Sequence, residues 1–438
     1  MKNTPHLFTS TLLMGCTLTV ENSALESLSG KNFGPMTNED TAEEDISVPE
    51  SDTWDTNFPA EADLAILLDT LSVPLIDFNT LDNAGDRFLP KAWLKRLREA
   101  YASTLVRDAI DKENQDSDWR LASIRISPCE PIGIRTDQDI DEWCWPAVHL
   151  IWQPVIEILP ADAEDSLYYA DDRAIKAIFP VAPRDREGNR ITGEWRQHIK
   201  QHLAENNSPR TLPEQMRTGF LAVRDASATA VLSGLSKLRD PNISTAAYES
   251  LDLRPESLQD GPIRSRFKDR LIDFLSEFAQ WQDLYELNAF SLPEGRDPAT
   301  DAWVFVSLKG NDGFPSVQDI TIIGGQSGLE LVNMGTSQTI TARAEDDAVE
   351  LALEEGNREL KASLIIDSED IEEKGDAMAD PYLFLTPNTS CASCHKVNPD
   401  EHDFHALSGF EDDGISVSPR TTKEVERDIF WARHILNP

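Results

Sequence analysis

The sequence predicts an α+β protein: a large mixed body with antiparallel strand pairs and helices, followed by a small, mostly α C-terminal segment. Strand-like runs follow one another along the chain more often than they alternate with helices, which favours antiparallel pairing. Amphipathic helical stripes separate groups of these runs, the clearest over residues 264–281. With 438 residues, of which 40% are hydrophobic, the chain can bury a sizeable core in roughly two or three domains.

The N-terminus has the pattern of an export signal. Lys2 supplies a positive charge, an apolar run covers residues 7–14, and Cys16 follows a glycine. This ending resembles the lipobox of bacterial lipoproteins, in which the chain is cleaved before the cysteine and acylated on it. We therefore expect residues 1–16 to be a signal peptide and Cys16 to carry lipid. A disordered N-terminus with an incidental cysteine is the alternative.

The same resemblance predicts where the protein is sent. Thr17, rather than an aspartate, follows the cysteine, which favours the outer membrane of a Gram-negative bacterium. No apolar run of the sequence approaches the length of a transmembrane helix. We expect an exported protein, periplasmic or anchored to the outer membrane, that touches the membrane only through lipid at Cys16.

An acidic stretch separates this signal from the body. Residues 17–59 are rich in Glu, Asp, Ser, Thr and Asn, and no Lys or Arg occurs over residues 32–86. Such a composition buries too little apolar surface to order the chain, so we expect a disordered tether. The formal net charge of the whole chain is −38, which argues against nucleic acid as a partner because a phosphate backbone would be repelled.

The body is expected to contain two α+β subdomains, residues 60–210 and 211–384. In the first, Trp93 and Leu97 recur at helical spacing within a helix predicted over residues 89–106. Two strand-like runs and a further helix follow, over residues 121–127, 147–158 and 193–206.

The second subdomain contains the clearest amphipathic helix, over residues 264–281. Five apolar side chains form its stripe: Phe267, Leu271, Phe274, Leu275 and Phe278. Another helix is predicted over residues 218–238. Short strand-like runs occupy residues 284–292, 303–308, 320–324, 329–334 and 338–344, before a helix over 346–357 and a strand over 360–366.

The C-terminal segment, residues 385–438, contains two predicted helices. Pro387, followed by Asn, Thr and Ser, is a helix-start signal. The last helix begins near residues 418–419, with Thr421 and Glu424 as a capping box. Its apolar face consists of Val425, Ile429, Ala432, Ile435 and Leu436.

Residues 391–395 read Cys-Ala-Ser-Cys-His and carry the clearest chemical signal of the chain. Cys391 and Cys394 stand one helical turn apart, so their thiols can take up the two vinyl groups of one haem as thioethers. His395 then points its imidazole at the iron, which is why C-x-x-C-H indicates attachment of a c-type haem. The expected cofactor is one haem c.

The motif and the last helix resemble the haem-bearing part of c-type cytochromes. This resemblance covers about the last sixty residues. It implies that Cys391 and Cys394 hold the haem covalently and that His395 is the proximal ligand of the iron. One-electron transfer is the activity it implies, with the body serving as a docking platform for a redox partner protein.

The sequence leaves several candidates for the second axial ligand of the haem iron. Small cytochromes c usually use a methionine downstream of the motif, and no methionine follows His395. His405 is the first candidate because its Asp-Phe-His-Ala-Leu run looks partly buried, and His434, His402 and Met378 are the others. Two protein ligands favour electron transfer, whereas a vacant position permits small-molecule chemistry. A peroxidase-like haem oxidoreductase is therefore the second hypothesis.

Two alternative interpretations of the motif involve no haem. The cysteines could hold zinc together with two of His395, His402 and His405, as in a non-redox, surface-binding lipoprotein. They could also be a plain thiol pair, although no strand–helix context of the thioredoxin type precedes them. We find no catalytic-triad pattern and no P-loop, and assign no catalytic residues. Acidic residues around the motif predict a basic docking face on the redox partner.

The remaining cysteines, Cys129 and Cys144, flank a loop between the strand-like runs at 121–127 and 147–158. A disulfide across this loop fits an oxidising compartment, and on the chain-entropy model it contributes about 3 kcal/mol. Two buried free cysteines are the alternative. With the disulfide, the 5 cysteines of the chain serve one lipid anchor, one disulfide and one haem.

Overall fold

The structure is a computed structural model of the chain. The chain divides into two compact units, Met1–Asp52 and Thr53–Pro438, and every residue that the structure describes belongs to the second unit. The described residues are 57–70, 74–102, 118–131, 144–158, 167–170, 174–185, 187–191, 214–291, 302–311, 314–317, 320–322, 325–327, 329–333, 338–339, 417 and 419–436.

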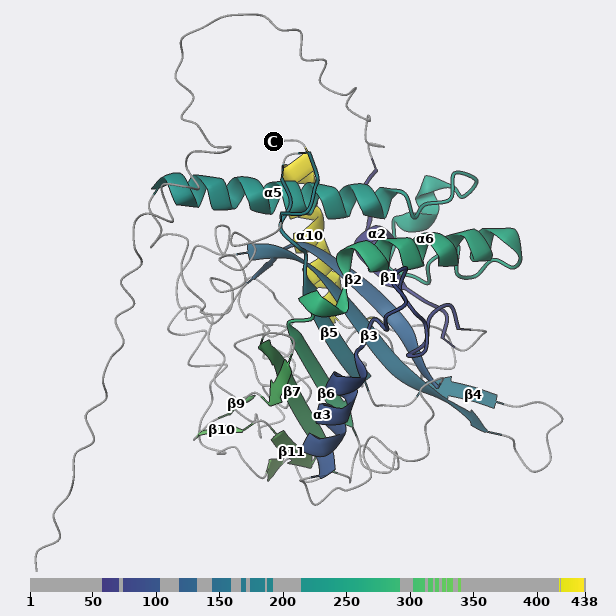
Figure 1. The fold of residues 1–438 in the computed structure, drawn as a ribbon. Helices are drawn as coiled ribbons and strands as arrows, with labels where there is room; N and C mark the ends of the chain where they lie inside the picture. Colours follow the sequence, from purple (N-terminus) through teal and green to yellow (C-terminus); the bar gives the residue numbers. More distant parts are fainter. Residues whose placement is uncertain are drawn as a thin grey trace, which may run out of the picture. The chain divides into compact units, whose positions relative to one another are not determined.

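A ten-stranded antiparallel sheet forms the centre of the described part (Figure 1). Its strands lie in the order β1-β2-β3-β5-β6-β7-β11-β12, with β4 paired to β3 and β8 paired to β7. Strands β9 and β10 form a separate antiparallel pair. The strands are β1 Ala65–Leu67, β2 Trp119–Pro131, β3 Cys144–Ile158, β4 Leu167–Ala170, β5 Ala174–Pro180, β6 Glu286–Ser291, β7 Ala302–Asn311, β8 Phe314–Val317, β9 Ile320–Ile322, β10 Gly325–Ser327, β11 Leu329–Asn333 and β12 Gln338–Thr339.

Helices pack around this sheet. Figure 1 shows α5 along one end of the sheet, α3 in front of it and α10 behind β2. The α-helices of the described part are α2 Glu61–Leu64, α3 Lys91–Ala102, α5 Glu214–Ser236, α6 Pro262–Phe278 and α10 Pro419–Leu436. The short 3-10 helices η3 Thr245–Tyr248 and η4 Trp281–Asp283 lie in the connections before and after α6.

One face of the sheet is apolar. Because side chains alternate between the two faces of a strand, residues in register across the strands form rows that point the same way. One such row crosses β1, β2, β3, β5, β6 and β7 and is 0% exposed throughout: Ile66, Ile124, Leu150, Ala177, Leu287 and Leu308. These residues belong to the main apolar core, which also includes Trp93 and Leu97 of α3. Burial of this row specifies the strand register, since a shift by one residue would move it to the other face.

Helix α6 packs into the same core through the stripe that the sequence predicts. Its buried residues are Phe267, Leu271, Phe274, Leu275 and Phe278. Helix α5 comes close to it at Gly234, where an added Cβ would lie 2.5 Å from a ring carbon of Phe278. Glycine is therefore required there by the close approach of the two helices, despite its cost of about 1 kcal/mol in a helix interior.

The α+β class predicted from the sequence is confirmed. The helices expected over residues 218–238 and 264–281 are α5 and α6, and the helix expected over 89–106 includes α3. The runs at 121–127 and 147–158 belong to the neighbouring strands β2 and β3. Other expected elements lie outside the described residues, namely those over 193–206, 346–357 and 360–366 and the segment that carries the C-x-x-C-H motif.

Three features differ from the expectations. The sheet continues across the boundary between residues 210 and 211, because β5 pairs with β6. Helix α10, which the sequence grouped with the motif segment, contributes Val425 and Ala432 to the main core of the body. The capping-box prediction is wrong: α10 already begins at Pro419, so Thr421 lies inside the helix, and the Glu424 carboxylate accepts hydrogen bonds from arginine side chains.

Candidate functional site

The other face of the sheet carries polar residues, which we call the polar face. It consists of two cross-strand rows on either side of the apolar row. The first row is Leu67, Ser123, Ile151, Lys176 and Asn288, and the second is Ala65, Arg125, His149, Ile178, Glu286 and Lys309. Because neighbouring positions of a strand alternate, both rows point away from the side of the apolar row.

Helix α10 covers the part of the polar face formed by β2 and β3. Thr421, Glu424 and Asp428 are buried, and their spacing places them on one side of the helix. Val425 and Ala432 are buried beside them. The covered side of α10 is thus half polar, and its polar half meets the charged residues of the strands.

Arg125 lies at the centre of this contact. Its Nη1 donates to Glu424 of α10, and its Nε donates to Oδ2 of Asp428 at 3.1 Å. Its Nη2 donates to Oε2 of Glu130, in the same strand, at 2.9 Å. One guanidinium therefore binds three carboxylates, two of which belong to a helix about three hundred residues further along the chain.

Further bonds surround this centre. The Ser127 hydroxyl donates to Oδ1 of Asp428 at 2.8 Å, and Arg427 donates to the same oxygen at 3.2 Å. Arg420 donates to Oε1 of Glu424 at 2.9 Å. The charges of α10 are therefore neutralised both by the strands and by its own arginines, as buried carboxylates require.

The pKa values of this cluster follow from burial and from the neighbouring charges. Burial opposes ionisation of Glu130 and Glu424, but Arg125 and the other cations outweigh it, lowering the pKa of Glu130 to about 2 and holding that of Glu424 well below its usual value. Burial raises the pKa of Asp428 despite the attraction of Arg125. Burial also lowers the pKa of His149 to about 3, although Glu130 acts in the opposite direction.

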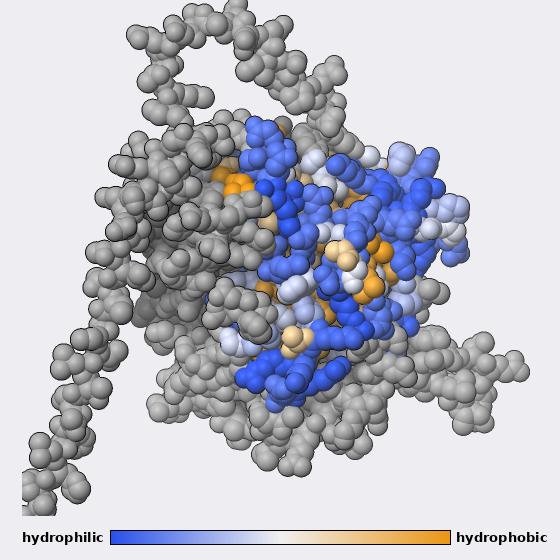
Figure 2. Space-filling model, in the orientation of Figure 1, coloured by the Kyte–Doolittle hydropathy of each residue, from blue (hydrophilic) through white to orange (hydrophobic). Residues whose placement is uncertain are grey.

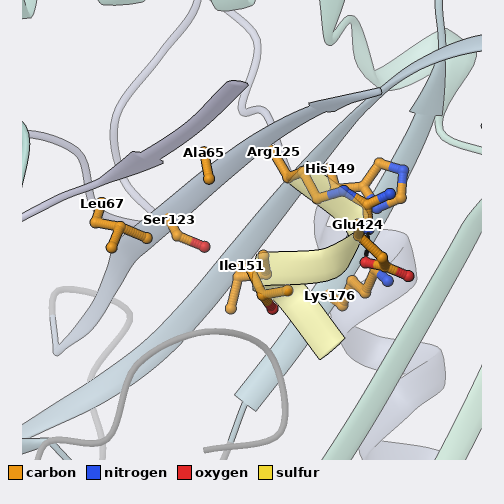
Figure 3. Close-up of a pocket in the computed structure, with 9 residues that line it drawn as sticks. Ala65, Leu67, Ser123, Arg125, His149, Ile151, Lys176 and Glu424 are labelled. Atoms are coloured by element: carbon orange, nitrogen blue, oxygen red, sulfur yellow. Dashed lines mark hydrogen bonds and ion pairs between the residues drawn. The ribbon is translucent and has the colours of Figure 1, made fainter. Parts of the chain in front are cut away.

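A small cavity lies beside the cluster, between the polar face and the start of α10 (Figure 3). Its volume is about 20 Å³, which is room for about one water molecule or one ion of similar size. The polar residues that line it are Ser123, Arg125, His149, Lys176, Thr421 and Glu424. This volume is smaller than that of an organic substrate.

Lys176 and His149 bring nitrogen atoms to this cavity. Lys176 is 5% exposed, and burial lowers the pKa of its ammonium group, with Glu424 acting in the opposite direction. His149 is 0% exposed, and neither of its ring nitrogens has a hydrogen-bond partner among the described residues. Oε2 of Glu130 lies 3.6 Å from its Nε2.

The C-terminal half of α10 presents aromatic residues. The described surface in Figure 2 is largely hydrophilic, with scattered apolar residues. Large hydrophobic side chains exposed in the described part are Leu81, Leu258 and Phe430. Phe430 is followed by Trp431, whose ring meets the exposed ring of His434 edge-on at 5.9 Å between centroids. Of the four candidates for the second haem ligand, His434 is the one that belongs to the described residues.

The other predicted site residues are placed as follows. Cys129 and Cys144 lie at disulfide distance, with their Cα atoms 4.7 Å apart. Both are buried against Trp431 of α10, and Nη1 of Arg224 lies 3.6 Å from Sγ of Cys144. The remaining predicted residues lie outside the described part of the chain: Cys16, Met378, Cys391, Cys394, His395, His402 and His405.

The sequence interpretation missed the polar face. A signal for it does exist, because His149 and Lys176 each interrupt an otherwise apolar run of a strand, and Arg125 alternates with apolar residues along β2. A single charge inside such a run indicates a paired or functional group, since an isolated charge is costly to bury. Its partners on α10 carry no signal of their own, because acidic residues on an amphipathic helix normally face water.

The chain was compared with models of protein families, with curated proteins and with solved structures, and none of them matches it. Within the described ranges, no group of three or more His, Cys, Asp or Glu side chains could hold a metal ion. Nor is any helix among them both long and apolar enough to cross a membrane.

Proposed function

We propose that the protein is an exported c-type cytochrome that carries one covalently attached haem and acts in one-electron transfer. The observation that carries this proposal is the sequence Cys-Ala-Ser-Cys-His at residues 391–395. Cys391 and Cys394 are the attachment residues, and His395 is the proximal ligand of the iron. When bound, the haem supplies a one-electron redox centre, and its potential depends on the second ligand and on burial.

The cysteine pair in the body supports export. Cys129 and Cys144 lie at disulfide distance, and structural disulfides persist in oxidising compartments. Covalent attachment of haem takes place in the same compartment, outside the bacterial cytoplasm. A signal peptide over residues 1–16 and a lipid at Cys16 complete the proposed route, which ends in the periplasm or at the outer membrane.

The placement of α10 supports a role for the body. The motif lies in the chain between β12, which ends at Thr339, and α10, which starts at Pro419. Strand β12 pairs with β11, and α10 is bound to β2 by the Arg125 cluster. The segment that bears the motif is therefore tied to the body at both ends. This arrangement suits a body that presents the haem segment to a redox partner.

The net charge of the chain indicates the partner. At −38, the chain attracts a protein with a basic docking face and repels nucleic acid. Electrostatic attraction of this kind raises the rate of encounter between redox proteins and weakens with added salt. We therefore propose a basic partner whose electron exchange with this protein slows as the ionic strength rises.

An absorption spectrum tests the proposal. The full chain is produced in a host whose periplasm assembles cytochromes c, and a Soret band that persists after acid–acetone extraction is expected. The double variant Cys391→Ser, Cys394→Ser should lose this band, while Ser393→Ala, inside the same motif, should keep it. Absence of the band from the wild-type chain, while a co-expressed cytochrome c matures normally, contradicts the proposal.

Absorption spectra with added carbon monoxide or cyanide distinguish an electron carrier from a haem enzyme. A low-spin spectrum that carbon monoxide and cyanide leave unchanged is expected for a carrier, because both axial positions are filled. Single variants His405→Ala, His434→Ala and Met378→Leu identify the second ligand, since its loss should give a high-spin spectrum. A wild-type haem that binds carbon monoxide readily would favour the peroxidase-like alternative.

A further inference from the structure

We propose that the cavity on the polar face binds one small monovalent anion of about the size of chloride, held by Lys176, His149 and Ser123 at the start of α10. The site lies in the body and does not depend on the haem. Its ligand class follows from the charge and the donors that line the cavity and from its size.

Lys176 provides the charge. The residue is only 5% exposed, and it lines the cavity. Within the described residues, no carboxylate oxygen lies within 4.0 Å of its ammonium group, and Glu424, Glu130 and Glu286 act on it only from further away. A buried ammonium group has three donors and is costly to leave without a partner.

His149 and Ser123 provide further donors. Neutral imidazole always carries one N–H group, and both ring nitrogens of His149 are buried without a hydrogen-bond partner in the described part. Ser123 lines the cavity from the neighbouring strand. Lys176, His149 and Ser123 come from the adjacent strands β5, β3 and β2 and sit in the two rows of the polar face. All three line the cavity: Lys176 and His149 lie on the side of Arg125 and Glu424, and Ser123 lies beyond Ile151 (Figure 3).

The start of α10 adds to the positive potential. Thr421 lies in the first turn of the 18-residue helix and lines the cavity. The first N–H groups of a helix carry a partial positive charge that favours anions. Glu424 also lines the cavity, but Arg125 and Arg420 bind its carboxylate. The charged residues that line the cavity are Arg125, Lys176 and Glu424, and their net charge is +1.

The volume of the cavity selects among anions. About 20 Å³ holds one particle of the size of water. Chloride or bromide fits this space, whereas sulfate, phosphate and gluconate do not. A water molecule fits as well, but it would leave Lys176 only the more distant attraction of Glu424, Glu130 and Glu286 and no anion in contact.

Thermal unfolding at fixed ionic strength tests this site in the full chain. Replacing sodium gluconate by sodium chloride should raise the melting temperature by on the order of 2 °C for each tenfold increase of chloride above its dissociation constant. Sodium sulfate at the same ionic strength should not. Lys176→Met should abolish the chloride response and melt higher than wild type without chloride, because it removes a buried charge that has no carboxylate in contact with it. Lys309→Met, in the second row of the same face, should keep the response.

Diffraction keeps the proposal testable if Lys176→Met fails to fold. Wild-type crystals grown with bromide should give an anomalous peak between Lys176 and His149. The site is absent if chloride and gluconate give equal melting temperatures in wild type, if the chloride effect is the same in Lys176→Met, or if the cavity contains water alone in bromide. None of these outcomes bears on the haem, whose test is the absorption spectrum.

Discussion

The two faces of the central sheet use the same strands but are buried in different ways. The row from Ile66 to Leu308 is wholly apolar and is stabilised by surface removed from water, at about 25 cal/mol per Å². On the polar face Arg125 is only 5% exposed, and its burial depends on carboxylates that α10 brings to it. An apolar contact can repack when one member changes, but a buried charge cannot stay without its partner. The polar face is therefore the more vulnerable of the two.

The largest effect is expected for Arg125→Met. It leaves Glu130, Glu424 and Asp428 buried without the guanidinium that binds them, which costs about 3–5 kcal/mol of unfolding free energy. Denaturant unfolding at pH 7 measures the loss, and hydrogen exchange should show that α10 opens first. The exposed Arg96 of α3, whose ion pair with Glu99 spans 3.4 Å, is the matched control, and Arg96→Met should cost less than about 1 kcal/mol. A loss for Arg125→Met no larger than the control would contradict the account of α10.

Leu150→Ala tests the apolar face. A fully buried leucine replaced by alanine costs about 2–5 kcal/mol through lost transfer energy and a cavity, whereas Leu150→Met should cost less than about 1.5 kcal/mol. The two faces should differ in their response to acid. The Arg125→Met loss should shrink below pH 4 as the stranded carboxylates protonate, and the Leu150→Ala loss should not change. Equal acid responses would remove the distinction between the faces.

The sequence was sufficient for elements with a regular apolar pattern. The stripe of α6 and the apolar side of α10 were both predictable, because i, i+3, i+4 spacing has few interpretations other than a buried helix face. Strands β2 and β3 were predictable because β-branched and aromatic residues occur there in runs of strand length. The short strands β1, β4, β8 and β10 were not, since runs of three or four residues carry too little pattern and are specified by their neighbours in the sheet.

The candidate site was not predictable from the sequence because it depends on register and on contacts between distant segments. The position of Arg125 in a strand is readable, but its partner Glu424 lies 299 residues away along the chain. The sequence suggested a local use for Glu424, as a capping residue for α10. In the structure the Glu424 carboxylate pairs with Arg125 instead. Water is excluded around the buried guanidinium, so it does not compete for the carboxylate.

The pH dependence of the unfolding free energy tests one residue of the polar face, His149. His149 is buried with a pKa of about 3, against an ordinary value of 6.5. Its contribution to stability is complete above pH 6.5 and is lost as the pH falls toward 3, by about 1.4 kcal/mol per pH unit. Glu130 and Glu424, whose pKa values are lowered, add to this loss only below about pH 4.5. Asp428, with a raised pKa, acts in the opposite sense.

The variant His149→Gln isolates this effect. It should flatten the fall in unfolding free energy between pH 6.5 and 4.5 and leave the steeper fall below pH 4.5 in place. Denaturant unfolding in a series of buffers measures both slopes. If the slope between pH 6.5 and 4.5 is the same in wild type and variant, the buried imidazole is not responsible for it.

The smallest effect is expected where the polar face lies beyond α10. Lys309 stands opposite Glu286 in the register of β6 and β7, and both are partly exposed. The Lys309 ammonium also lies 4.6 Å from the centre of the Tyr285 ring. Cross-strand charge pairs and exposed cation–π contacts each contribute up to about 1 kcal/mol, so Lys309→Met should lower the unfolding free energy by no more than about 1–2 kcal/mol. A loss near that of Arg125→Met would show that the whole polar face, and not only the part under α10, depends on paired charges.

The intact mass of the exported chain tests the central claim most directly. The polar face binds α10 to the body, and α10 follows the C-x-x-C-H motif, so the proposed haem segment is tied to a folded platform. From a host that assembles cytochromes c, we predict a polypeptide that begins at Cys16, carries lipid there, and is heavier by one haem that remains attached under denaturing conditions. The Cys391→Ser, Cys394→Ser chain should differ by the loss of that haem. A wild-type mass without haem, from cells in which another cytochrome c has matured, would contradict the account.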